Sequence, residues 1–149
     1  MGVKESLCAV DLEDTMAPSV EYAKMMASMT GASILVAYVI PAHTPYEDVY
    51  LSVNNQPNEV NNPNETIQKS MNALLAEQFA GMDATGVILV GRPSEELVKL
   101  AEEKGANLIV MGTHGRAGFD RLLFGSVAHE VVRAAPCPVM TVRPLMPKK

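Results

Sequence analysis

The chain has 149 residues, 48% of them hydrophobic and 19% charged, with a formal net charge of −5 and a pI near 5.1. This length and composition suit one globular domain, which we expect to span residues 1–149 and to bury a core without disulfides or metals. The acidic balance argues against nucleic acid or an anionic membrane as partner, and no apolar run approaches the roughly 20 residues that cross a bilayer, so we expect a cytoplasmic protein.

The first predicted element is a strand from Val3 to Asp11. Its central run, Leu7 to Val10, is apolar on both faces, which is typical of a parallel strand covered by helices on two sides. The strand ends at Asp11, which would stand at the carboxyl end, the edge at which open α/β sheets bind ligands. Taken alone, Asp11 is more simply a turn or helix-capping carboxylate.

The second predicted element is a helix from Thr15, its N-cap, to about Thr30. Pro18 is tolerated in the first turn of a helix, and Gly31 suits the left-handed residue that follows a helix C-terminus. The helix also carries a methionine group, which we interpret as packing rather than as a metal site because thioethers fill irregular apolar space. This group consists of Met25, Met26 and Met29.

The middle of the chain alternates strands and helices around one irregular segment. Residues 42–62 have neither helical nor strand periodicity, and we expect them to form a long loop. The regular elements on either side are a strand over Ser33–Ile40, a helix from Pro63, a strand over Thr85–Gly91 and a helix from Pro93 that Gly105 ends.

The most informative segment follows an apolar strand that ends at Met111. It begins Gly112-Thr113-His114-Gly115, and nine residues separate Gly115 from the pair Gly125-Ser126. A Gly-x-x-Gly pattern alone is a weak signal, because glycines end strands and begin turns in many proteins. The longer pattern, with its second glycine pair at a fixed distance, is far more specific.

These residue types suit a phosphate site. Gly112 and Gly115 allow a loop to point successive N–H groups at one anion. We expect Gly125-Ser126 to open the next helix, with Ser126 at the N-cap, where its hydroxyl and the positive end of the helix dipole favour a phosphate. Arg116 would add a charge-assisted contact.

The alternation of elements predicts an α/β fold, a single doubly wound sheet of five parallel strands in the order 3-2-1-4-5, with helices on both faces. The first and fourth strands are then neighbours, so Asp11 and Gly112 share one crevice. The fifth strand is a short apolar edge, and we expect a homodimer that covers it by pairing through Val139–Arg143.

The segment from Gly112 to Val127, followed by Ala135-Pro136-Cys137-Pro138-Val139, resembles the ATP-binding branch of the universal stress protein family. The resemblance extends over most of the chain, from Leu7 to Arg143. It implies an ATP-binding protein that often dimerises through the fifth strand, with Asp11 near the base and sugar and Val39 on the adenine face. The implied nucleotide-binding residues are Ala9, Val10, Asp11, Val39, Met111, Gly112, Gly115, Arg116, Gly125, Ser126 and Val127.

One departure from the family lies directly after Asp11. The chain continues Leu12-Glu13-Asp14, whereas a small residue and then Ser is commoner in the family. The two added carboxylates would repel phosphates unless a cation lay between them. A bound Mg²⁺ with Asp11 as a ligand would remove this repulsion, since Mg²⁺ is held by one or two carboxylates together with phosphate oxygens.

Three functional hypotheses follow. The first is a binding or regulatory module that holds ATP and changes partner choice or stability with nucleotide state. The second is a slow Mg²⁺-dependent ATPase or phosphotransferase that uses Asp11 or Glu13, and the third is a nucleotide-free dimeric scaffold for an unknown client protein. The sequence has no Gly-x-x-x-x-Gly-Lys-Ser/Thr loop and no recognisable Ser-His-Asp arrangement, which favours binding over catalysis.

Two cysteines, Cys8 and Cys137, are expected to be free thiols. On strands separated by one other strand they would be about 9–10 Å apart, which exceeds disulfide reach.

Overall fold

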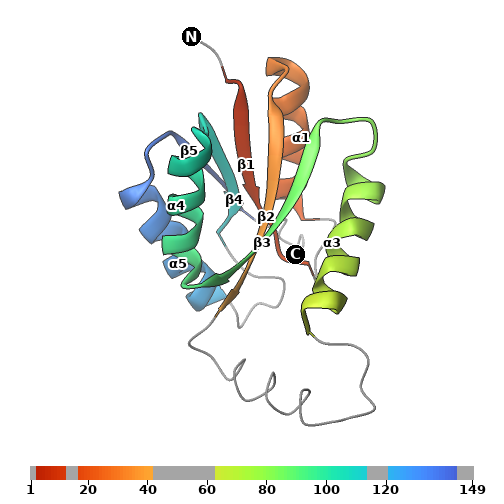
Figure 1. Cartoon of the computed structure of the whole chain (residues 1–149). Coiled ribbons are helices and arrows are strands. Elements are labelled where there is room, and N and C mark those ends of the chain that lie inside the picture. Colours follow the sequence, from red (N-terminus) through yellow and green to blue (C-terminus); the bar gives the residue numbers. More distant parts are fainter. Residues whose placement is uncertain (1–2, 13–16, 42–62, 114–120, 144–149) are drawn as a thin grey trace, which may run out of the picture.

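The computed structural model describes residues 3–12, 17–41, 63–113 and 121–143, which form five strands and four helices. The strands form one parallel sheet in the order β3-β2-β1-β4-β5, which confirms the predicted order. Helices α4 and α5 lie on one side of the sheet, and α1 and α3 lie on the other (Figure 1). The strands are β1 (Glu5–Ala9), β2 (Ser33–Pro41), β3 (Ala84–Gly91), β4 (Leu108–Gly112) and β5 (Val139–Val142). The helices are α1 (Pro18–Thr30), α3 (Pro63–Gln78), α4 (Pro93–Lys104) and α5 (Arg121–Ala134).

Strand β1 is the centre of the sheet. Its residue Cys8 pairs with Val36 of β2 on one side and with Val110 of β4 on the other. Alternate side chains of β1 enter different cores: Leu7 joins the cluster under α4 and α5, whereas Cys8 joins the cluster under α1 and α3. Both side chains are fully buried, which explains why this strand is apolar on both faces.

Glycine and proline residues mark the ends of the helices. Gly31 and Gly105 adopt positive φ angles of 76° and 66° directly after α1 and α4, as C-terminal glycines commonly do. The N–H of Gly31 donates to the carbonyl oxygen of Ala27 at 2.8 Å. Helix α1 begins at Pro18 and not at Thr15, because the proline takes the first helical position and Ala17 precedes it in extended conformation. The expected cap, Thr15, lies outside the described residues, as does the expected loop 42–62.

Only one of the three methionines of α1 packs against the hydrophobic core. Met26 packs against the cluster under α1 and α3, but Met25 and Met29 are exposed, so the packing interpretation is wrong for these two. The physical reason is the helical period: the buried face of α1 is set by Val20 and Ala23, and the two exposed methionines project from the opposite face.

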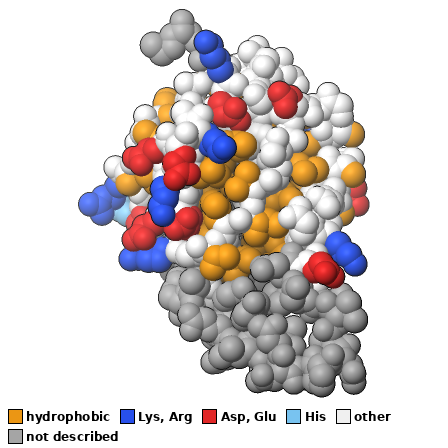
Figure 2. Space-filling view, in the orientation of Figure 1, with side chains coloured by type: hydrophobic (Ala, Val, Ile, Leu, Met, Phe, Trp, Pro, Cys, Tyr) orange, Lys and Arg blue, Asp and Glu red, His pale blue; other side chains and the backbone are white. Residues whose placement is uncertain are grey.

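Strand β3 forms one edge of the sheet, and its apolar side chains are only half-buried. Figure 2 shows hydrophobic side chains gathered at the middle of the face seen in Figure 1, with charged side chains on the side where α4 lies. Gly86 lets α3 approach this strand closely, since a Cβ there would meet the Cγ of Met71 at 2.6 Å. Within the described ranges, no helix is long and apolar enough to cross a membrane.

Both cysteines are free, as expected. Cys8 is fully buried in β1, and burial raises the pKa of its thiol from 9.0 to about 12. Cys137 lies just before β5, and burial raises its pKa too.

Candidate functional site

The candidate site lies where β1 and β4 end side by side. The last residues that pair between the two strands are Cys8 and Val110, so Ala9 and Met111 come one residue further along β1 and β4. The chain after β1 continues to α1 on one face of the sheet, whereas the chain after β4 continues to α5 on the other. Neighbouring strands whose connections leave in opposite directions create a crevice at their carboxyl ends.

The β1 side of this crevice is held by backbone contacts. The N–H of Val10 donates to the carbonyl oxygen of Ala37 at 2.9 Å, which keeps the chain beside β2 beyond the last residue of β1. Asp11 follows and is half-buried. Val39, on β2, is buried in the same cluster as Ala9 and Met111. The structure therefore brings the predicted residues of the first two strands to one edge of the sheet.

The β4 side is fixed to the edge strand. Gly112 pairs with Val142 of β5, and the N–H of Thr113 donates to the carbonyl oxygen of Val142 at 3.1 Å. Gly112 thus stands beside the chain that follows β1, as the strand order requires. Gly115 and Arg116 lie outside the described residues.

The predicted start of α5 is wrong. We expected Gly125-Ser126 to open this helix, but α5 begins at Arg121, so both residues lie within it and Ser126 is not an N-cap. The run from Arg121 to Phe124 contains no Gly or Pro, and Arg and Leu are good helix formers, so the helix extends back through this run. Ser126 is exposed, whereas Val127 is buried in the cluster under α4 and α5.

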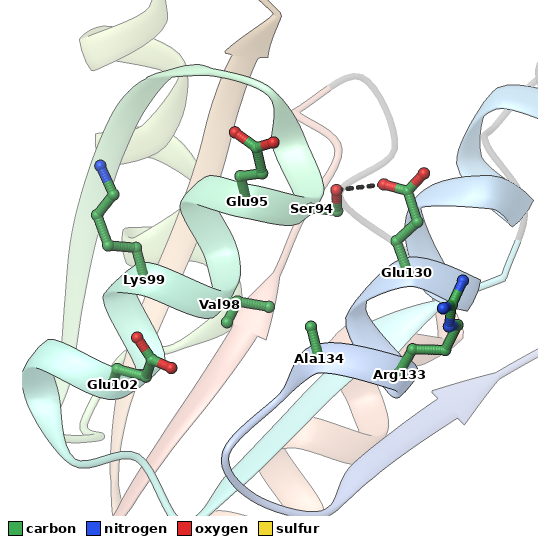
Figure 3. Close-up of a pocket in the computed structure, with 8 residues that line it drawn as sticks. All are labelled: Ser94, Glu95, Val98, Lys99, Glu102, Glu130, Arg133 and Ala134. Carbon is green, nitrogen blue, oxygen red and sulfur yellow. Dashed lines mark hydrogen bonds between the residues drawn. The ribbon is translucent and has the colours of Figure 1, made fainter.

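A hollow that the sequence did not indicate lies between α4 and α5 (Figure 3). This α4–α5 groove has a volume of about 510 Å³. It is lined by Ser94, Glu95, Val98, Lys99, Glu102, Glu130, Arg133 and Ala134. None of these residues is among those predicted to bind a nucleotide, so the groove is a separate feature of the described structure.

Polar contacts join the two walls of the groove. The hydroxyl of Ser94 donates to Oε1 of Glu130 at 2.5 Å, and Ser94 itself is buried (Figure 3). Arg92 approaches Glu95 at 3.4 Å and Glu130 at 4.0 Å, but these charged side chains are largely exposed to water. Exposed ion pairs of this kind contribute little to stability. The α4–α5 groove is therefore best understood as a helix contact with a hydrated, mixed-charge rim.

Few described side chains near the crevice could coordinate a metal ion. Within the described ranges, no group of three or more His, Cys, Asp or Glu side chains is placed to hold a metal ion. Asp11 offers a hard carboxylate ligand at the crevice, and the other two acids of the sequence proposal, Glu13 and Asp14, lie outside the described residues. A cation here would need phosphate oxygens from a nucleotide as further ligands.

The sheet order and its carboxyl-edge crevice define an open, doubly wound α/β protein of the kind that binds small ligands at a switch point. A model of the universal stress protein family matches residues 3–143, and the chain therefore belongs to this family. The universal stress protein MJ0577 of Methanocaldococcus jannaschii is 27% identical over 94% of both chains. MJ0531 of the same organism is 47% identical over a shorter stretch, which covers 50% of this chain and 42% of MJ0531.

Solved structures share the fold. That of MJ0577 matches with a TM-score of 0.75 at 24% identity and covers 99% of this chain and 100% of the other. A universal stress protein in complex with cAMP has a TM-score of 0.69 at 23% identity, over 96% of this chain and 98% of the other. One from Archaeoglobus fulgidus in complex with dAMP has a TM-score of 0.57 at 24% identity, over 95% and 98%.

Proposed function

We propose that this protein binds an adenine nucleotide, ATP by preference, in the crevice between β1 and β4, and acts as a nucleotide-dependent regulatory module in the stress response. The observation that carries the proposal is the position of Asp11 and Gly112 at the ends of adjacent strands whose connections diverge. The glycine pattern that continues from Gly112 to Gly115 supplies the backbone donors that a phosphate requires. Two proteins of the same fold were solved in complex with cAMP and with dAMP, which supports an adenine ligand.

The proposed roles follow the chemistry of each position. Ala9, Val10 and Val39 offer apolar contact to the base, and Asp11 accepts hydrogen bonds from the sugar or holds Mg²⁺ with the phosphates. The phosphates lie against the backbone N–H groups after β4. That side of the site consists of Met111, Gly112, Gly115, Arg116, Gly125, Ser126 and Val127. Because Ser126 is not an N-cap, its contribution is its own hydroxyl on the exposed face of α5.

The first test is mass spectrometry of small molecules released by denaturing the purified protein, followed by titration of the emptied protein with ATP and Mg²⁺. We expect an adenine nucleotide to co-purify and to be lost from Gly115→Val, whose side chain would occupy the phosphate loop. Asp11→Ala should weaken ATP binding about tenfold, the loss expected for one hydrogen bond to a charged group.

The matched control is Arg133→Ala, which removes a charged residue from the α4–α5 groove and leaves the crevice intact. It should bind ATP as the native protein does. If neither crevice variant changes affinity, or if the native protein ignores ATP at every concentration tested, the proposal is wrong and the nucleotide-free scaffold becomes the better model.

We also propose that the protein is a cytoplasmic homodimer. The two free thiols fit a reducing compartment. Strand β5 is an edge of the sheet, and its four residues, Val139–Val142, carry no charge that would discourage pairing. Thr141→Lys places a charge on this edge at an exposed position and should give a monomer in light scattering after size exclusion. Thr85→Lys, an exposed position on the opposite edge strand β3, is the control and should remain dimeric.

A further inference from the structure

The outer face of α1 carries an exposed apolar stripe. Its members, Tyr22, Met25 and Met29, are 45%, 44% and 73% exposed and lie three and four residues apart, so they share one helix face. The opposite face of α1, with Val20, Ala23 and Ala27, is buried against the sheet. Packing against the sheet therefore explains why the buried face of α1 is apolar, but it does not explain the exposed apolar stripe.

The sulfur atoms of the described residues differ sharply in access. Met71 and Met111 are fully buried, and Met26, Met82 and Met140 are partly buried against the core. Cys8 is also fully buried, and its raised pKa keeps it a neutral thiol at physiological pH, the form that reacts slowly with peroxide. Cys137 is partly buried against the cluster under α4 and α5. Met25 and Met29 are therefore the most exposed sulfur-bearing side chains among the described residues, and an oxidant in solution meets them first.

We propose that Met25 and Met29 form an oxidant-responsive modification site, at which peroxide-class two-electron oxidants convert the thioethers to sulfoxides. A sulfur lone pair attacks one oxygen of hydrogen peroxide, the O–O bond breaks, and an S–O bond forms. After proton transfer between the two oxygens, water leaves. Each methionine loses two electrons and gains one oxygen atom, while the peroxide is reduced by the same two electrons.

The position of the site lets this reaction change the surface without unfolding the protein. Neither Met25 nor Met29 belongs to the buried clusters, so a polar sulfoxide there does not enter the core. Beside the stripe, the partly buried Lys24 and the exposed Glu21 form an ion pair at 3.5 Å, in which neither methionine takes part. Oxidation therefore turns the outer face of α1 from apolar to polar, and methionine sulfoxide reductases can reverse it. The inference does not depend on nucleotide binding.

The test is graded treatment of the native full chain with hydrogen peroxide, quenching with free methionine, and peptide mapping that assigns each added oxygen to its residue. We expect Met29 and Met25 to be oxidised about tenfold faster than Met71 and Met111, in keeping with their exposure. Far-UV circular dichroism should stay unchanged while these two residues become fully modified. Similar rates at all described methionines, or loss of the native spectrum with the first oxygen added, would overturn the proposal.

Two leucine variants sharpen this test. The double variant Met25→Leu, Met29→Leu should lose the fast oxygen uptake in the α1 peptide, since leucine keeps the apolar shape but has no sulfur. Met26→Leu, on the same helix and partly buried, should retain that fast uptake. If the Met26 variant loses it and the double variant keeps it, the stripe is not the reactive site.

Discussion

The crevice expected at the ends of β1 and β4 and the groove between α4 and α5 are built differently. The crevice is made from strand ends, held by fully buried side chains such as Met111 and by backbone hydrogen bonds such as that from the N–H of Val10 to the carbonyl oxygen of Ala37. The groove is made from long side chains on two helix surfaces, most of them in contact with water. A position set by the sheet is rigid, whereas a position set by exposed ion pairs is adaptable. This difference favours the crevice as the place for the nucleotide binding proposed above.

The largest effect expected from this difference is on stability. Met111→Ala removes a fully buried side chain beneath the crevice and should lower the free energy of unfolding by about 2–5 kcal/mol. Val98→Ala in the groove truncates a partly buried side chain and should cost about 1 kcal/mol or less. Urea denaturation measures both. Equal losses would mean that the groove is as tightly packed as the crevice floor.

The next effect concerns pH and the strand that leads to the crevice. Because burial raises the pKa of Cys8 from 9.0 to about 12, the folded chain holds this proton where the unfolded chain loses it. The stabilising contribution is complete below pH 9 and falls between pH 9 and 12, by about 1.4 kcal/mol for each pH unit. Cys8→Ala removes the titration, so the stability of the native protein relative to this variant should decline over the same range. A pH-independent difference in urea denaturation would contradict the assignment.

A smaller effect is expected at the joint between the groove walls. Ser94→Ala leaves Glu130 without the hydroxyl that donates to it, and the loss of this hydrogen bond should cost about 1 kcal/mol. Because the contact lies outside the crevice, ATP affinity should be unchanged. Thermal unfolding and a nucleotide titration on the same sample check both parts. A strong loss of ATP affinity in this variant would show that the groove and the crevice are coupled, and would contradict their description as separate sites.

The smallest effect is expected for Arg92, an exposed cation directly before α4 that pairs with Glu95 and Glu130 of the groove. Arg92→Ala removes two ion pairs, at 3.4 Å and 4.0 Å, between largely exposed side chains, and should change stability by less than about 1 kcal/mol. Added salt should reduce even this difference, because it screens surface charges. A loss comparable to that of Met111→Ala would show that the rim is structurally essential.

The sheet could be predicted from the sequence because its signals are local. Apolar strand runs, the helix between each pair of strands, and the stop signals at Gly31 and Gly105 together specify the alternation of strands and helices. The usual topology of doubly wound sheets then supplies the strand order, which the structure confirms. The position of Asp11 near Gly112 followed from that order alone. Small differences at the strand ends, such as β3 beginning at Ala84 and not at Thr85, do not affect it.

The features that were missed depend on information that is not local. A Gly-Ser pair resembles a helix start and predicts α5 too late in the chain, although the preceding four residues already favour helix. The residue type of Met25 and Met29 suits packing, but it does not show which face of a helix meets the sheet. The groove depends on how α4 and α5 lie against each other, which no single segment encodes. The nucleotide contacts themselves stay a prediction.

The central position of β1 has a consequence for synthesis on the ribosome. Asn107, at the start of β4, accepts hydrogen bonds from the N–H groups of Lys4 and Glu5, which are 103 and 102 positions earlier in the chain. As the chain emerges, β2 can cover one side of β1 early, but the other side keeps unpaired backbone groups until β4 has been made. Such an open edge can pair with the wrong strand, and long-range pairing is slow. The nascent chain therefore passes through a long interval in which one edge of its central strand is exposed, and this is the interval in which chaperone binding would matter most.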